Sequence, residues 1–110
     1  MEKSKTETYL GFCIRAQKVI FGVDNIENKR RGVCLLLADE TLGRSSFQTM
    51  VKAKEKFGCP LYIASAETLS NWTHRPAVKA VAITDHNLAS AIISIVESEP
   101  QLKIYSGGNN

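Results

Sequence analysis

The sequence lacks the features that define several large classes of protein. It has three cysteines, Cys13, Cys34 and Cys59, which are odd in number, widely spaced and set among apolar residues, and no Cys-x-x-Cys pair is present. With only two histidines in the chain, this pattern predicts buried free thiols rather than a disulfide framework or a metal site. We therefore expect no metal and no cofactor.

Long apolar runs are also missing, since none approaches the roughly 18 residues that a membrane-spanning helix requires. The first eight residues, MEKSKTET, contain no apolar core of the kind found in signal peptides. We therefore expect a cytoplasmic protein with no membrane partner.

Motifs of catalysis are absent as well. No nucleophile elbow, phosphate-binding glycine loop or metal-ligand cluster is visible. Asp39-Glu40 and Asp85-His86 each follow a predicted strand, where α/β active sites usually occur, but Asp85 is more simply a helix N-cap. We expect no enzyme.

The excess of positive charge is small. The 110 residues include 14 Lys or Arg and 11 Asp or Glu, which gives a formal net charge of +3. This charge permits nucleic-acid binding without demanding it, because dedicated nucleic-acid domains are often more basic. The length suits one domain and not two.

Apolar runs and capping residues predict strands that alternate with helices. Strands are expected at 19–21, 33–38, 61–64 and 78–84; helices are expected from Ser4 or Thr6 to about Ala16, at 25–31, from Ser45 or Ser46 to Phe57, at 66–71 and at 86–97. This order predicts an α/β fold, a three-layer α/β/α sandwich around a mixed sheet of about four strands. Residues 1–98 should form one domain, and 99–110 a partly disordered tail with its last five residues mobile.

The stretch 17–32, QKVIFGVDNIENKRRG, is the candidate functional region. A short apolar run meets Gly22, then come the helix-capping residue types Asp24 and Asn25, and a basic cluster follows. A helix that starts here would expose backbone N–H groups and a partial positive charge, which polyanions bind readily.

The ordered series of segments resembles the kink-turn RNA-binding ribosomal protein superfamily, the group of archaeal ribosomal protein seven-Ae and eukaryotic ribosomal protein thirty-e. It is most similar to small bacterial members encoded near ribosome and translation-factor genes. The segments that carry the resemblance are LGFCIRAQKVIFG (10–22), VCLLLADE (33–40), KFGCPLYIAS (56–65) and AVAITDHNLASAIISIV (80–96). The resemblance implies a non-catalytic, ribosome-associated protein that binds structured ribosomal or regulatory RNA.

Family members that bind kink-turns carry a Gly-x-Asn-Glu-x-x-Lys signature after the first strand. Here Gly22 matches, while Asp24, Asn25 and Asn28 occupy the Asn, Glu and Lys positions. A carboxylate at Asp24 cannot donate a hydrogen bond to guanine O6. Asn25 could accept one from a guanine amine, but without the charge of a glutamate.

The resemblance implies an RNA site built from this turn and from a second loop near 71–77. Gly22 would allow close backbone approach, Val23 would pack on a nucleotide, and Asn25 and Asn28 would contact base edges or sugars. The remaining predicted site residues are the phosphate-binding Lys18, Lys29, Arg30 and Arg75, together with Asp24 and Pro76 in the two loops. Trp72, in the second loop, more simply covers the edge of the core than stacks on a base.

The alternative interpretation is a protein-interaction or regulatory module of the same fold that does not bind kink-turns. Stress-response regulators of the growth-arrest type are of this kind, and the altered signature favours it. The segment QLKIY (101–105) would then pack on the sheet edge or add to a partner strand, with weak self-association as one result. RNA binding instead needs Lys18, Lys29, Arg30 and Arg75 to converge on one face.

Overall fold

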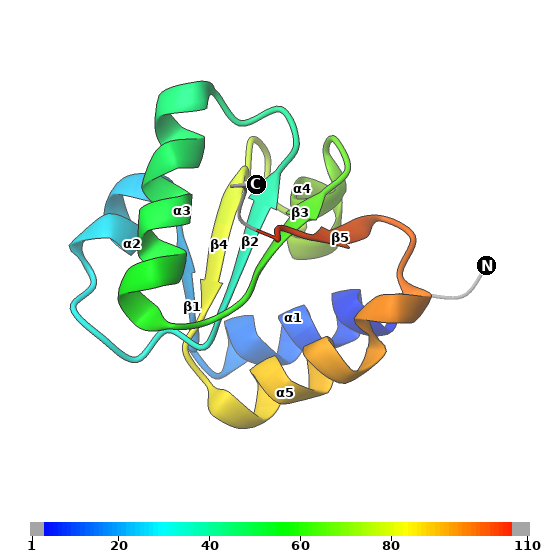
Figure 1. Ribbon diagram of the computed structural model, residues 1–110. Helices are drawn as coiled ribbons and strands as arrows, with labels where there is room; N and C mark the ends of the chain where they lie inside the picture. The colour runs from blue at the N-terminus through cyan, green and yellow to red at the C-terminus, as the bar shows by residue number, and fades with distance from the viewer. Residues whose placement is uncertain (1–3, 107–110) are drawn as a thin grey trace.

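The computed structural model describes residues 4–106 as an α/β fold around one five-stranded sheet (Figure 1). The strand order is β1-β4-β2-β3-β5. The elements are α1 (Lys5–Arg15), β1 (Val19–Phe21), α2 (Val23–Asn28), β2 (Leu35–Asp39), α3 (Arg44–Phe57), β3 (Leu61–Ala64), α4 (Thr68–Thr73), β4 (Ala80–Ile83), α5 (His86–Ile95), a 3₁₀ turn at Val96–Ser98 and β5 (Leu102–Ile104).

Helices cover both faces of the sheet, as the alternating pattern predicts (Figure 1). Helices α2 and α3 pack on one face, where Ile26 and Met50 belong to a single buried cluster. Helices α1, α4 and α5 pack on the other face, where Leu10, Leu69 and Ile92 are fully buried. Every residue of β2 and β4 is buried, because these central strands have a helical layer on each side.

The direction of β4 decides what lies at each end of the sheet. It runs antiparallel to both β1 and β2, whereas β2 and β3 are parallel. We call the end where β1, β2 and β3 finish the carboxyl end, and the opposite end, where they begin, the amino end. Asp39 finishes β2 at the carboxyl end, while Asp85 follows β4 at the amino end. The Asp39-Glu40 and Asp85-His86 pairs therefore lie at opposite ends of the sheet and form no common site.

The sheet has one strand more than the four expected, and this strand lies in the predicted tail. Leu102–Ile104 pairs antiparallel with β3, and Leu102 is buried. Just before it, the buried carboxylate of Glu99 accepts hydrogen bonds from the Thr6 N–H, at 3.2 Å, and from the Ser4 hydroxyl. The strand lies within the segment 101–105, for which the alternative interpretation expected packing on the sheet edge, and that packing is confirmed. Its three residues with one buried apolar side chain carry too little pattern to place it in the main sheet prediction. The expected mobility of the last five residues concerns positions 107–110, outside the described residues, and exposed Ser106.

Three predicted helix ends are confirmed. Ser4 caps α1 by accepting from the N–H groups of Thr6 and Glu7. The Asp85 carboxylate accepts from the Leu88 N–H at 2.8 Å, and Gly58 ends α3 in the left-handed conformation, with φ +63°.

Other predicted boundaries are shifted. Helix α3 begins at Arg44 rather than after Ser45 or Ser46, and its N-cap is Gly43. Helix α4 spans Thr68–Thr73, so the first part of the loop predicted at 71–77 is helical. The hydrophobic pattern of the sequence locates a short helix such as α4 poorly, because a helix of this length is held by tertiary contacts. No helix among residues 4–106 is long and apolar enough to cross a membrane.

The capping hydrogen bond of Asp85 should be measurable as stability. We predict that Asp85→Ala lowers the free energy of unfolding by about 1 kcal/mol, because one N-terminal N–H of α5 loses its partner. The matched control is Asp24→Ala, since Asp24 lies in the first turn of α2 and makes no capping bond. Urea denaturation followed by circular dichroism compares the two variants. Equal losses would contradict this account of the two aspartates.

Candidate nucleic-acid interface

The turn after β1 and the segment before β4 border an open cleft of about 460 Å³ at the carboxyl end of the sheet. Its lining residues are Phe21, Gly22 and the run from Arg75 to Ala80. The Gly22 N–H donates to the Ala80 carbonyl at 3.0 Å, which ties the two walls together. The structure therefore brings three predicted site residues, Gly22, Arg75 and Pro76, into one cleft.

The Arg75 side chain is held at the wall of this cleft. Its guanidinium carbon lies 4.1 Å from the centroid of the Phe21 ring, at the end of β1. The backbone N–H of Arg75 donates to the Ser70 carbonyl at 3.2 Å. A guanidinium stacked on an aromatic face keeps its N–H groups available at the edge of the plane, where they can bind an anion.

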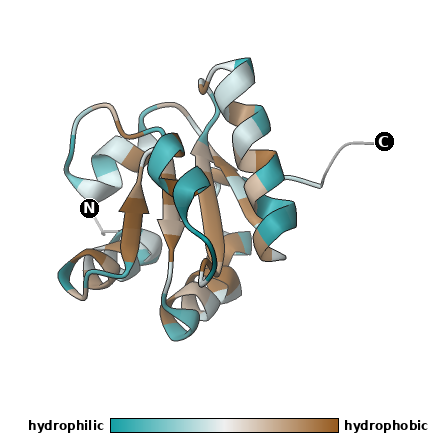
Figure 2. Ribbon diagram, turned by 90° about the vertical axis from the view of Figure 1, so that its left-hand side faces the viewer, coloured by the Kyte–Doolittle hydropathy of each residue, from teal (hydrophilic) through white to brown (hydrophobic). Residues whose placement is uncertain are grey.

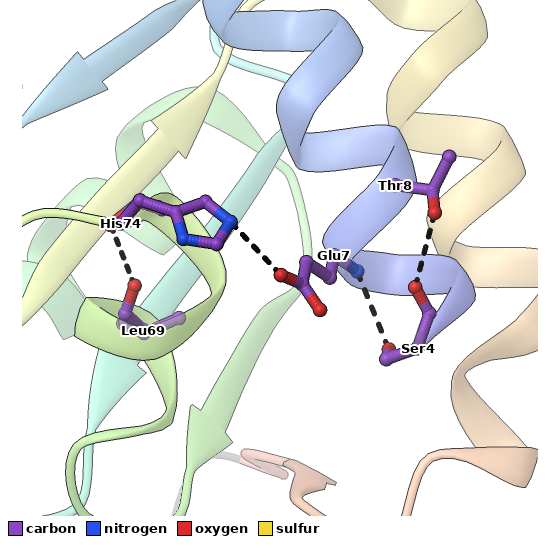
Figure 3. Close-up of polar contacts among 6 residues, drawn as sticks. Ser4, Glu7, Thr8, Leu69 and His74 are labelled. Carbon is purple, nitrogen blue, oxygen red and sulfur yellow. Dashed lines mark hydrogen bonds and ion pairs between the residues drawn. The ribbon is translucent and has the colours of Figure 1, made fainter. Parts of the chain in front are cut away.

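The loop that carries Arg75 is fixed by its neighbours. His74 and Ala77 both have positive φ, +59° and +58°, a conformation that side-chain-bearing residues rarely adopt. The Ser70 hydroxyl accepts from the Val78 N–H at 2.8 Å, and His74 Nε2 lies 3.0 Å from the Glu7 carboxylate of α1 (Figure 3). These contacts keep the loop beside Gly22.

The turn into α2 is made by glycine and not by side-chain caps. Gly22 is the N-cap with φ +93°, and no side chain caps this helix, so the expected capping by Asp24 and Asn25 is wrong. The Asn25 amide instead donates back to the Phe21 carbonyl at 2.9 Å. Asp24 is exposed, and Val23 is half-buried against the core beneath α2. Only part of Val23 thus remains for contact with a ligand.

The predicted basic residues do not converge on the cleft. The Lys18 carbonyl accepts from the Thr84 N–H at 2.9 Å at the amino end of the sheet, about 13 Å along the extended strand from Gly22. Asn28, Lys29 and Arg30 lie at the carboxyl terminus of α2, about 9 Å along that helix from its start. Arg75 is the only one of the four predicted phosphate contacts that lines the cleft.

Sequence reasoning missed Lys79 and the structural role of Asp39. Lys79 is exposed and lines both this cleft and a neighbouring one of about 460 Å³. Asp39 is only 2% exposed; it accepts from the N–H and hydroxyl of Thr41, at 2.7 and 2.5 Å, and from the Glu67 N–H at 3.0 Å. The sequence does contain a signal for each residue. Lys79 is the one charged residue in the apolar run 78–84, and Asp39 precedes Thr41 with the Asp-x-Thr spacing that is typical of a turn closed by the aspartate side chain.

The electrostatics of Asp39 follow from these contacts. Burial acts to raise its pKa, but the hydrogen bonds from Thr41 and Glu67 and the nearby charge of Lys79 outweigh burial and hold the pKa below its ordinary value. Asp39 thus stays ionised and holds the start of α4 against the end of β2.

Trp72 and two of the three cysteines are buried, as the simpler of their predicted roles requires. Trp72 is only 8% exposed and belongs to the buried cluster, so it offers no stacking surface. The three cysteines are free thiols; burial raises the pKa of Cys13 and of Cys59 to about 11, while Cys34 is half-buried. No group of three or more His, Cys, Asp or Glu that could hold a metal ion occurs among residues 4–106.

Comparisons with known proteins support the fold and add no function. No protein-family model matches the sequence. No curated protein matches it either. Among solved structures, the chain is similar to a protein of unknown function from Bacillus halodurans, with a TM-score of 0.71 and 14% identity, over 86% of this chain and 99% of that chain. At this identity the match shows a shared fold alone.

Asp39 should make stability depend on acid pH. The pKa of Asp39 is lower in the folded protein than in the unfolded chain. Its contribution to the free energy of unfolding is therefore fully present above the unfolded-state pKa of about 3.9, and it is lost as the pH falls through the folded-state pKa. We predict that Asp39→Asn is about 2–4 kcal/mol less stable at pH 7, because its three hydrogen bonds are disturbed. The variant should also lose part of the stability change that the native protein shows below about pH 4.

The control is Glu40→Gln, since exposed Glu40 accepts one hydrogen bond, from the Ala66 N–H at 2.9 Å. Urea denaturation at a series of pH values measures all three proteins. If Asp39→Asn loses as much stability below about pH 4 as the native protein does, Asp39 is not the source of the acid dependence.

Proposed function

We propose that this protein is a non-catalytic, ribosome-associated RNA-binding protein that holds kink-turn-like RNA in the cleft between Gly22 and Arg75. The observation that supports the proposal is the meeting of two loops, distant in sequence, that the family resemblance implies as RNA-facing. Gly22 and Arg75–Pro76 line the same open cleft at the carboxyl end of the sheet.

The chemistry of the cleft suits a folded polyanion. Gly22 has no side chain, so a nucleotide can approach the backbone at the start of α2 closely. Arg75 and Lys79 are exposed and flank the opposite wall, and neither makes an ion pair with residues 4–106. A planar guanidinium and a mobile ammonium together can contact two phosphates.

The altered signature residues Asp24 and Asn25 determine which groups of a nucleotide base the cleft could hydrogen-bond. Asp24 is exposed beside it, and its carboxylate would repel guanine O6 while it could accept from a base amine. The Asn25 amide is engaged with the Phe21 carbonyl, which leaves its oxygen as the acceptor. The proposal therefore assigns most affinity to shape and phosphate contact, and less to base recognition.

Replacing the two cations of the cleft tests this function. We predict that Arg75→Ala with Lys79→Ala weakens binding to a kink-turn RNA. The slope of log affinity against log salt should fall in magnitude by about one to two units, because a protein with fewer phosphate contacts releases fewer counterions when it binds. The measurement is a titration of labelled RNA at two salt concentrations, with a straight duplex for comparison.

Lys5→Ala with Lys103→Ala is the matched control, since both lysines are exposed and lie outside the cleft. Circular dichroism verifies that each variant is folded. Unchanged affinity and slope in the Arg75 and Lys79 variant, or no binding of either RNA by the native protein, would refute the proposal.

A second candidate, the protein-interaction module, is favoured by strand β5. This strand forms one edge of the sheet, and Ile104 in it is 57% exposed. Next to it, the rings of Tyr105 and Phe47 pack edge to face, with centroids 5.3 Å apart. An exposed apolar residue on an edge strand is a surface on which a partner strand can add.

Ile104→Lys tests this second candidate without removing the strand. If β5 mediates self-association, a charge at Ile104 should abolish it, because edge-to-edge pairing would bring two lysines together. Light scattering across a range of protein concentrations measures the mass, and Lys103→Ala on the same strand is the control. An unaltered mass for Ile104→Lys would exclude β5 as the contact.

A further inference from the structure

The amino end of the sheet carries a second group of cations, opposite the cleft. We define the amino-end basic surface as Arg15, Lys18, Lys29, Arg30 and Arg31, all of which are exposed. Three of the five are predicted phosphate contacts that the fold separates from Arg75. Their position follows from the chain path and the sheet register.

The end of α1 places Arg15 and Lys18 at the amino end of the sheet. The helix ends at Arg15, and the Lys18 N–H turns back to donate to the Cys13 carbonyl at 2.8 Å. Gln17, with φ +59°, makes the sharp turn between helix and strand. Lys18 then enters β1 beside Thr84, directly at the amino end of the sheet.

The segment after α2 reaches the same end. Val19 of β1 and Leu35 of β2 both pair with Ile83 of β4, so these two strands begin level with each other, about 10 Å apart. The chain from Asn28 must therefore pass the amino end to enter β2. Figure 2 shows a largely hydrophilic ribbon at the outer side of α2 and in the segment after it, in front of the apolar strands. Lys56 donates to the Lys29 carbonyl at 2.6 Å, which holds the segment in place.

The charges of this surface are not neutralised within residues 4–106. The only ion pair in that range joins His74 to Glu7. The acidic groups closest along the chain are Asp24 and Glu27, both exposed on α2. Asp85 follows Thr84, the backbone partner of Lys18, and its carboxylate caps α5. Exposed cations gathered at one end of the sheet repel one another, and an anionic partner bound there would relieve this repulsion.

An exposed aromatic ring extends the surface. Phe12 is 42% exposed, although most phenylalanines are buried, and the Arg15 guanidinium lies 5.0 Å from its centroid. Like the pair of Arg75 and Phe21 at the other end, this stack holds a guanidinium flat and leaves its N–H groups free. Both ends of the molecule thus present a stacked arginine with unpaired cations beside it.

We propose that the amino-end basic surface grips the phosphate backbone of an RNA stem whose adjoining loop occupies the cleft. This inference rests on the proposed function and adds a requirement for the ligand. The two surfaces are separated by about 13 Å along β1, which corresponds to about four to five nucleotide steps of a helical strand, because A-form RNA rises less per nucleotide than B-DNA. The ligand must therefore continue as a helix beyond the loop, and its stem is held independently of sequence, because lysine and arginine contact phosphates there.

The test uses two RNAs with the same kink-turn loop, one with a minimal stem and one whose stem is longer by about ten base pairs, which exceeds the four to five steps required. The amino-end variant is Lys18→Ala, Arg30→Ala and Arg31→Ala; the cleft variant is Arg75→Ala and Lys79→Ala. The control is Lys5→Ala, Lys52→Ala and Lys103→Ala, which removes three exposed charges elsewhere. Circular dichroism verifies folding of each.

We expect the amino-end variant to bind the long-stem RNA about tenfold to thirtyfold more weakly, with a salt slope lower by about two to three units, and to bind the short-stem RNA as the native protein does. The cleft variant should lose affinity for both RNAs. If only the cleft variant loses affinity, the inference fails while the proposed function stands.

The opposite result would support the amino-end basic surface and refute the cleft as the site of the loop. If the amino-end variant alone loses affinity for the long-stem RNA, the cleft is not the loop site and the basic surface still binds RNA. If the native protein binds neither RNA, both proposals fail, and an acidic protein becomes the partner to test for this surface. If the control triple variant loses as much affinity as the amino-end variant, net charge and not this surface drives binding.

Discussion

The antiparallel insertion of β4 between β1 and β2 is the constraint on which the arrangement of this protein depends. Because Ile83 pairs with both Val19 and Leu35, the starts of β1 and β2 are level, and the segment before β4 arrives beside the turn after β1. The hydrogen bond from Gly22 to Ala80 closes this contact. One register thus creates the cleft at the carboxyl end and collects the basic segments at the amino end.

The cleft is organised by polar groups that are already satisfied within the protein. Asp39 fixes the start of α4, Ser70 fixes the backbone of Val78, and the Phe21 ring positions Arg75. A loop with two residues at positive φ is therefore held in one conformation before any ligand arrives. Such preorganisation lowers the entropic cost of binding, and it leaves the charges of Arg75 and Lys79 for a polyanion.

Much of the fold could be predicted from local sequence, and much of the site could not. The apolar run VCLLLA and the N-cap Asp85 act locally, so β2 and the start of α5 were predicted within two residues. Strand β5 depends on pairing with β3, and α2 depends on packing against α3, so neither boundary is visible in pattern. The placement of Lys18 and Arg30 away from Arg75 follows from the direction of β4, which no local signal encodes.

The most direct test of the central claim is a titration of the ¹⁵N-labelled protein with kink-turn RNA, followed by amide chemical shifts. The account predicts that the largest changes fall at Gly22 and across Arg75–Lys79, with a second set at Lys18 and the segment 29–31. Changes confined to β5 and its neighbours, or none at a saturating amount of RNA, would contradict it.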